Sequence, residues 1–197
     1  MRRVRIEALA QGSAALRELV EDVRAGSVLA IPTESSYGLA VDPRSEAAVR
    51  RVFAIKGRDG GKPLLVVAAN RGQLEDLGVV ASRETLDRYV ALWPAPLTVL
   101  LPLRAPIPAS AGTATLAVRV PAHSKLRELL EATGPLTATS LNRSGESPFD
   151  DADSAEGAFG GEVDVLVDGG RTSGGAPSTL LDATVDRSEE RRVGKEC

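Results

Sequence analysis

The chain has 197 residues, of which 43% are hydrophobic and 26% are charged, so its composition is that of a globular protein rather than a disordered one. No apolar run approaches the roughly 20 residues that cross a membrane, and the first residues do not resemble a signal peptide. A formal net charge of −3 argues against a nucleic-acid binder that works through bulk charge.

Helical stripes alternate with short apolar runs along the chain. Ser13 and Ser45 are suited to cap two helices, and Gly26 and Gly134 to end two. Helices are predicted over 13–26, 45–56, 86–93, 126–134 and 152–159, and strands over 28–31, 64–67, 97–101, 116–120, 136–140, 163–167 and 178–183. The alternation predicts one domain, an open α/β sheet with helices on its faces.

A cluster of basic residues follows the second predicted helix. Lys56 continues the buried stripe of that helix, so we expect its ammonium to emerge at the edge of a cleft. Arg58 and Lys62 follow in a glycine-containing loop, and the three cations together could hold a polyphosphate. A solvated loop is the alternative. The segment 60–63 lacks the spacing of a Walker motif, and His123, alone before a helix, is better suited to capping than to metal binding.

Polar side chains also follow predicted strands. In open α/β sheets ligands bind outside strand ends, where Thr33, Ser35, Ser140 and Asn142 are placed, although each is also a good turn former. Arg119 lies within an apolar strand, and a charge in such a place needs a partner. That partner is either a structural carboxylate or an anionic ligand.

Six segments occur in the order of the motifs of the YrdC-like family, which the sequence resembles as a set. They are P-T-E-S-S-Y-G-L at 32–39, K-G-R at 56–58 with K-P-L at 62–64, W-P-A-P-L-T at 93–98, V-R-V-P at 118–121, S-L-N-R-S-G at 140–145 and S-T-L-L-D at 178–182. The resemblance implies a twisted, mixed sheet with a concave, basic groove. It also implies an enzyme that forms threonylcarbamoyl-AMP and pyrophosphate from L-threonine, bicarbonate and ATP, for tRNA modification.

The same resemblance implies roles for individual residues. Catalytic roles fall to Lys56, Arg58, Ser140 and Asn142. ATP contacts fall to Lys56, Arg58, Lys62, Thr115, Ser140 and Asn142. Threonine contacts fall to Thr33, Ser35, Arg119 and Ser178, with Arg119 on the amino-acid carboxylate. Magnesium enters with ATP, and no dedicated metal site is expected. Tyr37 and Trp93 are expected to be packing residues.

Three positions depart from the family pattern. Ser35 replaces a threonine, Leu141 replaces an alanine, and Val67 stands where many relatives carry a histidine that faces threonine.

The end of the chain differs from the rest. Residues 187–197 resemble a translated sequencing adapter, so we expect a YrdC-like domain over 1–186 that is shortened at its C-terminus, although a genuine charged tail is the alternative. We expect this segment to be disordered and not to pair as a strand. It contains Cys197, the only cysteine, and a domain without cysteine suits the cytoplasm.

Two other functions fit the resemblance. A non-catalytic relative that binds double-stranded RNA would use the same groove, and the acidic balance argues weakly against it. A carbamoyl-adenylating domain of hydrogenase maturation normally lies in a longer chain with zinc-finger motifs, which are absent here. For the enzyme we expect weak contact with tRNA or double-stranded RNA and a downstream tRNA-modifying complex as partners.

Overall fold

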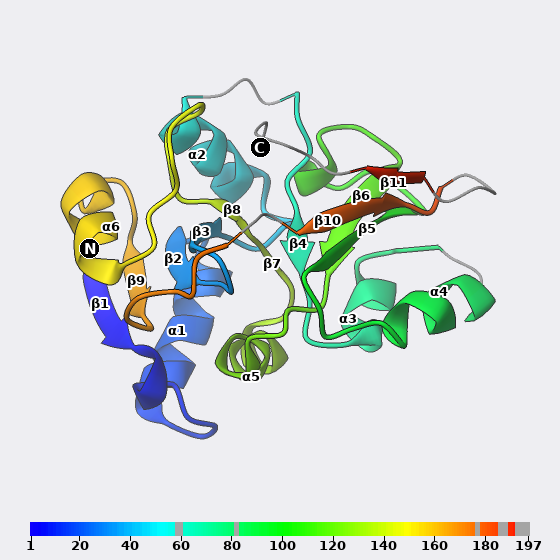
Figure 1. The fold of residues 1–197 in the computed structure, drawn as a ribbon. Helices are drawn as coiled ribbons and strands as arrows, with labels where there is room; N and C mark the ends of the chain where they lie inside the picture. Colours follow the sequence, from blue (N-terminus) through cyan, green and yellow to red (C-terminus); the bar gives the residue numbers. More distant parts are fainter. Residues whose placement is uncertain (58–60, 81–82, 176–177, 185–188, 192–197) are drawn as a thin grey trace.

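The computed structural model describes residues 1–57, 61–80, 83–175, 178–184 and 189–191. For residues 83–86 and 189–191 it describes the backbone only. Strands form two mixed sheets with helices packed around them (Figure 1). The first sheet has five strands in the order β1 (Arg2–Arg5), β9 (Val165–Asp168), β2 (Leu29–Pro32), β3 (Tyr37–Ala40) and β8 (Thr139–Ser140). The second has six in the order β11 (Glu189–Arg191), β10 (Thr179–Asp182), β5 (Leu97–Pro102), β6 (Thr115–Arg119), β4 (Val66–Val67) and β7 (Leu136–Thr137).

The helices are α1 (Ala14–Arg24), α2 (Glu46–Lys56), α3 (Arg71–Asp76), α4 (Arg83–Val90), α5 (Ser124–Thr133) and α6 (Ala152–Phe159), with single 3-10 turns at Ile6–Ala8 and Pro108–Ser110. Polar side chains cap the starts of α1, α2 and α5. The side chains of Ser13 and Ser45 accept hydrogen bonds from Leu16 N (3.1 Å) and Ala48 N (3.3 Å), as predicted. His123 caps α5, where its Nδ1 accepts from Leu126 N at 3.1 Å.

The predicted strand over 136–140 is wrong in one respect, because it divides at Ala138 between the two sheets. Thr137 is buried, and its Oγ1 accepts from Val41 N (3.1 Å) and donates to Leu39 O (3.2 Å). Ala138 N donates to Leu65 O at 2.9 Å. These bonds join the two sheets through one short segment, so the mixed α/β class is confirmed but the single sheet is replaced by two.

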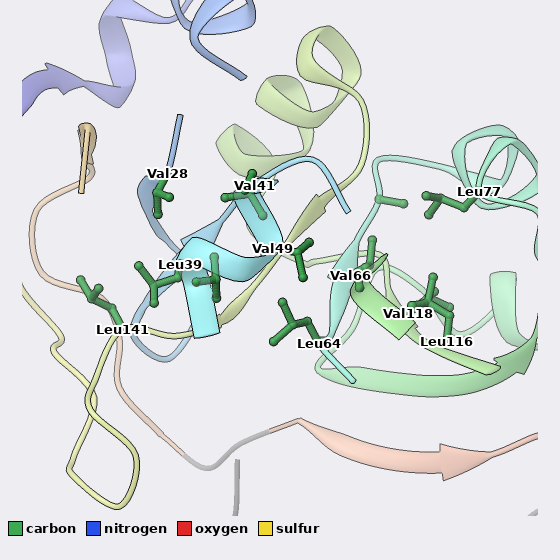
Figure 2. Packing of buried hydrophobic residues seen from close by; sticks show 14 of the residues in the cluster. Val28, Leu39, Val41, Val49, Leu64, Val66, Leu77, Leu116, Val118 and Leu141 are labelled. Carbon is green, nitrogen blue, oxygen red and sulfur yellow. The ribbon is translucent and has the colours of Figure 1, made fainter. Parts of the chain in front are cut away.

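Two apolar clusters cover opposite faces of the strands. Along residues 28–31, Leu29 and Ile31 pack with α1 and α5, whereas Val28 and Ala30 belong to the larger cluster around α2. This alternation explains why the strand is apolar at every position. Figure 2 shows residues of the larger cluster from β3, α2, β4 and β6 close together.

Tyr37 and Trp93 are packing residues, as predicted. Tyr37 is fully buried and Trp93 is 8% exposed. The Tyr37 hydroxyl donates to Gly170 O (2.8 Å) and accepts from Gly169 N (3.1 Å). It therefore links the start of β3 to the loop that follows β9.

Several short elements were not predicted from the sequence. Strand β1 is rich in arginine, β3 follows directly on a turn, and α3 is only six residues long. The expectation of an unpaired end is also wrong, since β11 pairs antiparallel with β10, with Leu181 opposite Glu190. Backbone pairing overrides the poor strand propensity of this charged segment.

Candidate active site

Lys56 lies in the last turn of α2, which Gly57 ends in the left-handed conformation (φ 59°). The lysine is 1% exposed, so its ammonium does not emerge at a cleft edge as predicted. Its Nζ donates to Ser140 O at 2.6 Å and to Asn142 Oδ1 at 2.7 Å. A buried ammonium requires such acceptors, and the loop after β8 supplies them.

The same loop is closed by its own polar bonds. Ser140 Oγ donates to Asn142 Oδ1 at 2.7 Å, and Asn142 Nδ2 donates to Glu146 O at 2.5 Å. Ser144 N donates to Lys56 O at 3.0 Å. The structure thus brings together Lys56, Ser140 and Asn142, three of the four residues predicted to be catalytic. The fourth, Arg58, lies outside the described residues.

Arg143 supports this cluster, and sequence reasoning assigned it no role. Its Nη1 donates to Ile55 O at the end of α2, and its guanidinium forms two bonds with Glu162, at 3.0 and 2.5 Å. The guanidinium also lies 4.9 Å from the centroid of the Phe159 ring. In the sequence, this role is indicated only by the position of Arg143 inside the S-L-N-R-S-G motif.

Arg119 ends β6 and is 5% exposed. Within the described residues its guanidinium donates no hydrogen bond, and its one charged neighbour is Glu34, whose Oε2 lies 3.4 Å from Nη2. Burial lowers the pKa of Arg119, and the charge of Glu34 opposes that effect. The predicted need for a partner is therefore met in part by a carboxylate, while Nε of Arg119 has no hydrogen-bond partner among the described residues.

Ser178 directly precedes β10, which is separated by β5 from β6, the strand that carries Arg119. Its Oγ is 2.7 Å from Thr98 Oγ1, and Thr98 is 4% exposed. Val99 pairs with Val118, so Thr98 and Arg119 each follow directly on the last paired residues at this end of β5 and β6. Thr98 was missed by sequence reasoning, although it closes the W-P-A-P-L-T motif.

Val67 completes this end of the sheet. It is fully buried and pairs with Arg119 across β4 and β6. The position at which the sequence departs from the expected histidine is thus next to Arg119, and it presents an aliphatic side chain.

The remaining predicted residues are dispersed. Thr33 Oγ1 donates to Ser36 O at 2.7 Å, so this hydroxyl forms a turn, and the carbonyl of half-buried Ser35 accepts from Thr172 Oγ1 at 3.0 Å. Thr115 starts β6, at the opposite end from Arg119, and Lys62 is exposed. A cavity of about 280 Å³ is lined by Thr33, Glu34, Ala122, His123 and Thr172 among others.

Neither a metal-binding cluster nor a membrane-spanning helix is found among the described residues. No group of three or more His, Cys, Asp or Glu side chains there is arranged to hold a metal ion. No helix in that part of the chain has the length and apolarity to cross a membrane.

Two mixed sheets with helices on both faces, a cluster of Lys56, Ser140 and Asn142, and a buried arginine that donates no hydrogen bond to the described residues define an α/β protein with a site suited to anionic ligands. The Sua5/YciO/YrdC family model, described as "Telomere recombination", matches residues 21–194. The chain belongs to this family.

Two relatives of this chain carry the same name. Threonylcarbamoyl-AMP synthase of Thiobacillus denitrificans is 40% identical over 163 residues, which cover 81% of this chain and 86% of the relative. The protein of the same name from Pseudomonas fluorescens is 35% identical over 169 residues, covering 85% and 91%.

Solved structures agree with the fold. The structure of P. abyssi Sua5 in complex with L-threonine has a TM-score of 0.83 at 32% identity, covering 96% of this chain and 56% of that one. Escherichia coli YciO has a TM-score of 0.79 at 22% identity, covering 100% and 96%, and shows the fold alone.

Proposed function

We propose that this chain is a threonylcarbamoyl-AMP synthase, which converts L-threonine, bicarbonate and ATP to threonylcarbamoyl-AMP and pyrophosphate. The observation that carries the proposal is the convergence of separate family motifs on Lys56, Ser140 and Asn142, together with a buried Arg119 on the second sheet whose Nε has no hydrogen-bond partner among the described residues. Relatives that bear this enzyme name match most of the chain.

In this proposal ATP is bound by Lys56, Arg58, Lys62, Thr115, Ser140 and Asn142, along a basic groove. Lys56 already holds Ser140 and Asn142 in fixed positions, which favours a preorganised phosphate site. Magnesium enters with the triphosphate, whose charge it screens.

L-threonine is bound by Thr33, Ser35, Arg119 and Ser178. The unsatisfied guanidinium of Arg119 is suited to the amino-acid carboxylate. The Ser178 hydroxyl, fixed by Thr98, is suited to a small polar ligand. The complex of P. abyssi Sua5 with L-threonine supports this ligand class.

The chemistry needs few acid–base groups. The threonine amine reacts with bicarbonate to form a carbamate and water, and the carbamate carboxylate then attacks the α-phosphorus of ATP, so that pyrophosphate leaves. Positioning and stabilisation of phosphate charge supply most of the catalysis. The product would pass to a tRNA-modifying complex in the cytoplasm, with only weak direct contact to tRNA.

The test is pyrophosphate release from ATP and bicarbonate, measured with threonine, with valine and without an amino acid. Strong stimulation by threonine alone is expected, because valine has the same shape but lacks the hydroxyl. Equal rates with threonine and valine would overturn the threonine assignment. Binding of double-stranded RNA without threonine-dependent release would favour the non-catalytic alternative.

A further inference from the structure

Glu34 lies in the turn between β2 and β3 and contacts both the cavity and Arg119. Its Oε1 accepts a hydrogen bond from Ala122 N at 2.6 Å, and its side chain is 22% exposed. Glu34 also lines the cavity described above. No role for this residue follows from the sequence motif or from the proposed function.

The ion pair between Glu34 and Arg119 is incomplete. Neither Glu34 Oε2 nor Arg119 Nε has a hydrogen-bond partner in the described part of the chain, and both atoms are buried. A half-satisfied buried ion pair is costly, because desolvation is not offset by hydrogen bonds.

The protein forms a complete pair elsewhere. Arg143 and Glu162 make two hydrogen bonds at 3.0 and 2.5 Å, although their side chains are 41% and 38% exposed. Arg119 and Glu34 are far more buried, where a complete pair would matter more, yet they are joined by a single 3.4 Å contact. A purely structural role does not explain this arrangement.

The unmet atoms are complementary to an α-amino acid. One buried acceptor and one buried cationic donor lie side by side, and an α-amino acid carries its ammonium and its carboxylate on the same carbon. We propose that Glu34 binds the α-ammonium of the amino acid whose carboxylate binds Arg119. The inference rests on the proposed function and adds to it a residue that selects for the amine.

Entry of the ligand requires only a small change. Glu34 and Arg119 share no hydrogen bond that must be broken, and Glu34 borders the cavity. Rotation of the carboxylate, with Oε1 kept on its hydrogen bond from Ala122 N, would expose Oε2 to a ligand in that cavity. The amine becomes a nucleophile only after the ammonium has lost a proton, so Glu34 would bind and orient the amino acid before that step.

The test compares Glu34→Gln with the wild type for two ligands, L-threonine and 2,3-dihydroxybutanoate, in which a hydroxyl replaces the ammonium. Binding is measured by calorimetry without bicarbonate. The glutamine keeps an oxygen for Ala122 N but loses the charge. We expect it to weaken threonine binding about tenfold or more and to leave binding of the analogue within about twofold.

Controls separate this inference from the proposed function. Glu128→Gln, in an exposed pair with Lys125, should change neither affinity, and melting curves report folding. Arg119→Lys should weaken the binding of both ligands. An equal loss of affinity for both ligands in Glu34→Gln, or an unchanged affinity for threonine, would overturn the role of Glu34. Wild-type protein that binds ATP but neither ligand would instead refute the proposed function.

Discussion

The ammonium of Lys56 lies 2.7 Å from Oδ1 of Asn142, across 86 residues of sequence. This bond joins the end of α2 to the loop after β8, and it fixes an asparagine that also accepts from Ser140 Oγ at 2.7 Å. Asn142 Oδ1 therefore receives two donors, so its amide nitrogen must point to Glu146 O. The cluster has one orientation, which a phosphate-binding site requires.

Lys56→Met should reduce both stability and activity. The methionine fills similar space but leaves Ser140 O and Asn142 Oδ1 without their cation, at a cost of about 1–3 kcal/mol in unfolding free energy. Denaturant unfolding and pyrophosphate release measure the two effects. Lys125→Met, at a lysine that is 49% exposed, is the control. Unchanged stability would show that the Lys56 bonds contribute nothing net.

Thr98→Val should impair use of threonine while the fold is retained. Valine keeps the shape of Thr98 but removes the 2.7 Å bond that fixes Ser178. We expect KM for threonine to rise about three- to tenfold and KM for ATP to stay unchanged. Thr133→Val on α5 is the matched control, since its Oγ1 bonds only local carbonyls. A rise in KM for ATP alone would contradict the placement of Ser178 in the threonine site.

Tyr37→Phe should lower stability and change its dependence on alkaline pH. Loss of the hydroxyl removes its hydrogen bonds to Gly169 N and Gly170 O, which should lower the free energy of unfolding by about 1–2 kcal/mol. Burial raises the pKa of Tyr37 above its ordinary value of 10.0. Above pH 10 the unfolded tyrosine loses its proton while the folded one keeps it, so the wild type loses stability as pH rises.

The phenylalanine variant lacks this titration, and its stability should fall less steeply between pH 9 and 11 than that of the wild type. Urea unfolding across that range measures the difference. Parallel pH curves for the two proteins would show that Tyr37 does not titrate differently on folding.

Arg143→Met should loosen the end of α2 and slow turnover. The variant loses the bonds to Ile55 O and Glu162, which together are worth about 1 kcal/mol because the pair is partly exposed. Arg24→Met, whose pair with Glu21 is 70% exposed on both sides, should have no effect. Thermal melting and kcat are measured together. Normal kcat in a destabilised variant would limit Arg143 to a structural role.

Local physical chemistry made much of the fold predictable. Ser13 and Ser45 cap their helices as expected, because a short hydroxyl side chain reaches the free backbone amides at a helix start. Apolar periodicity gave the correct type for most long elements. Short or charged elements such as β1 and α3 lack a periodic signal, and tertiary pairing forms them.

The sequence by itself determined the family, through the order of its motifs, and the need of Arg119 for a partner. Only the tertiary structure decided that the strands form two sheets, that Lys56 is buried, and that Thr98 contacts Ser178 across 80 residues. The reason is that caps and periodicity act within a few residues, whereas register and sheet order depend on the packing of the whole chain. The incomplete contact of Glu34 with Arg119 belongs to this second class, because only the folded chain shows which polar atoms remain unsatisfied.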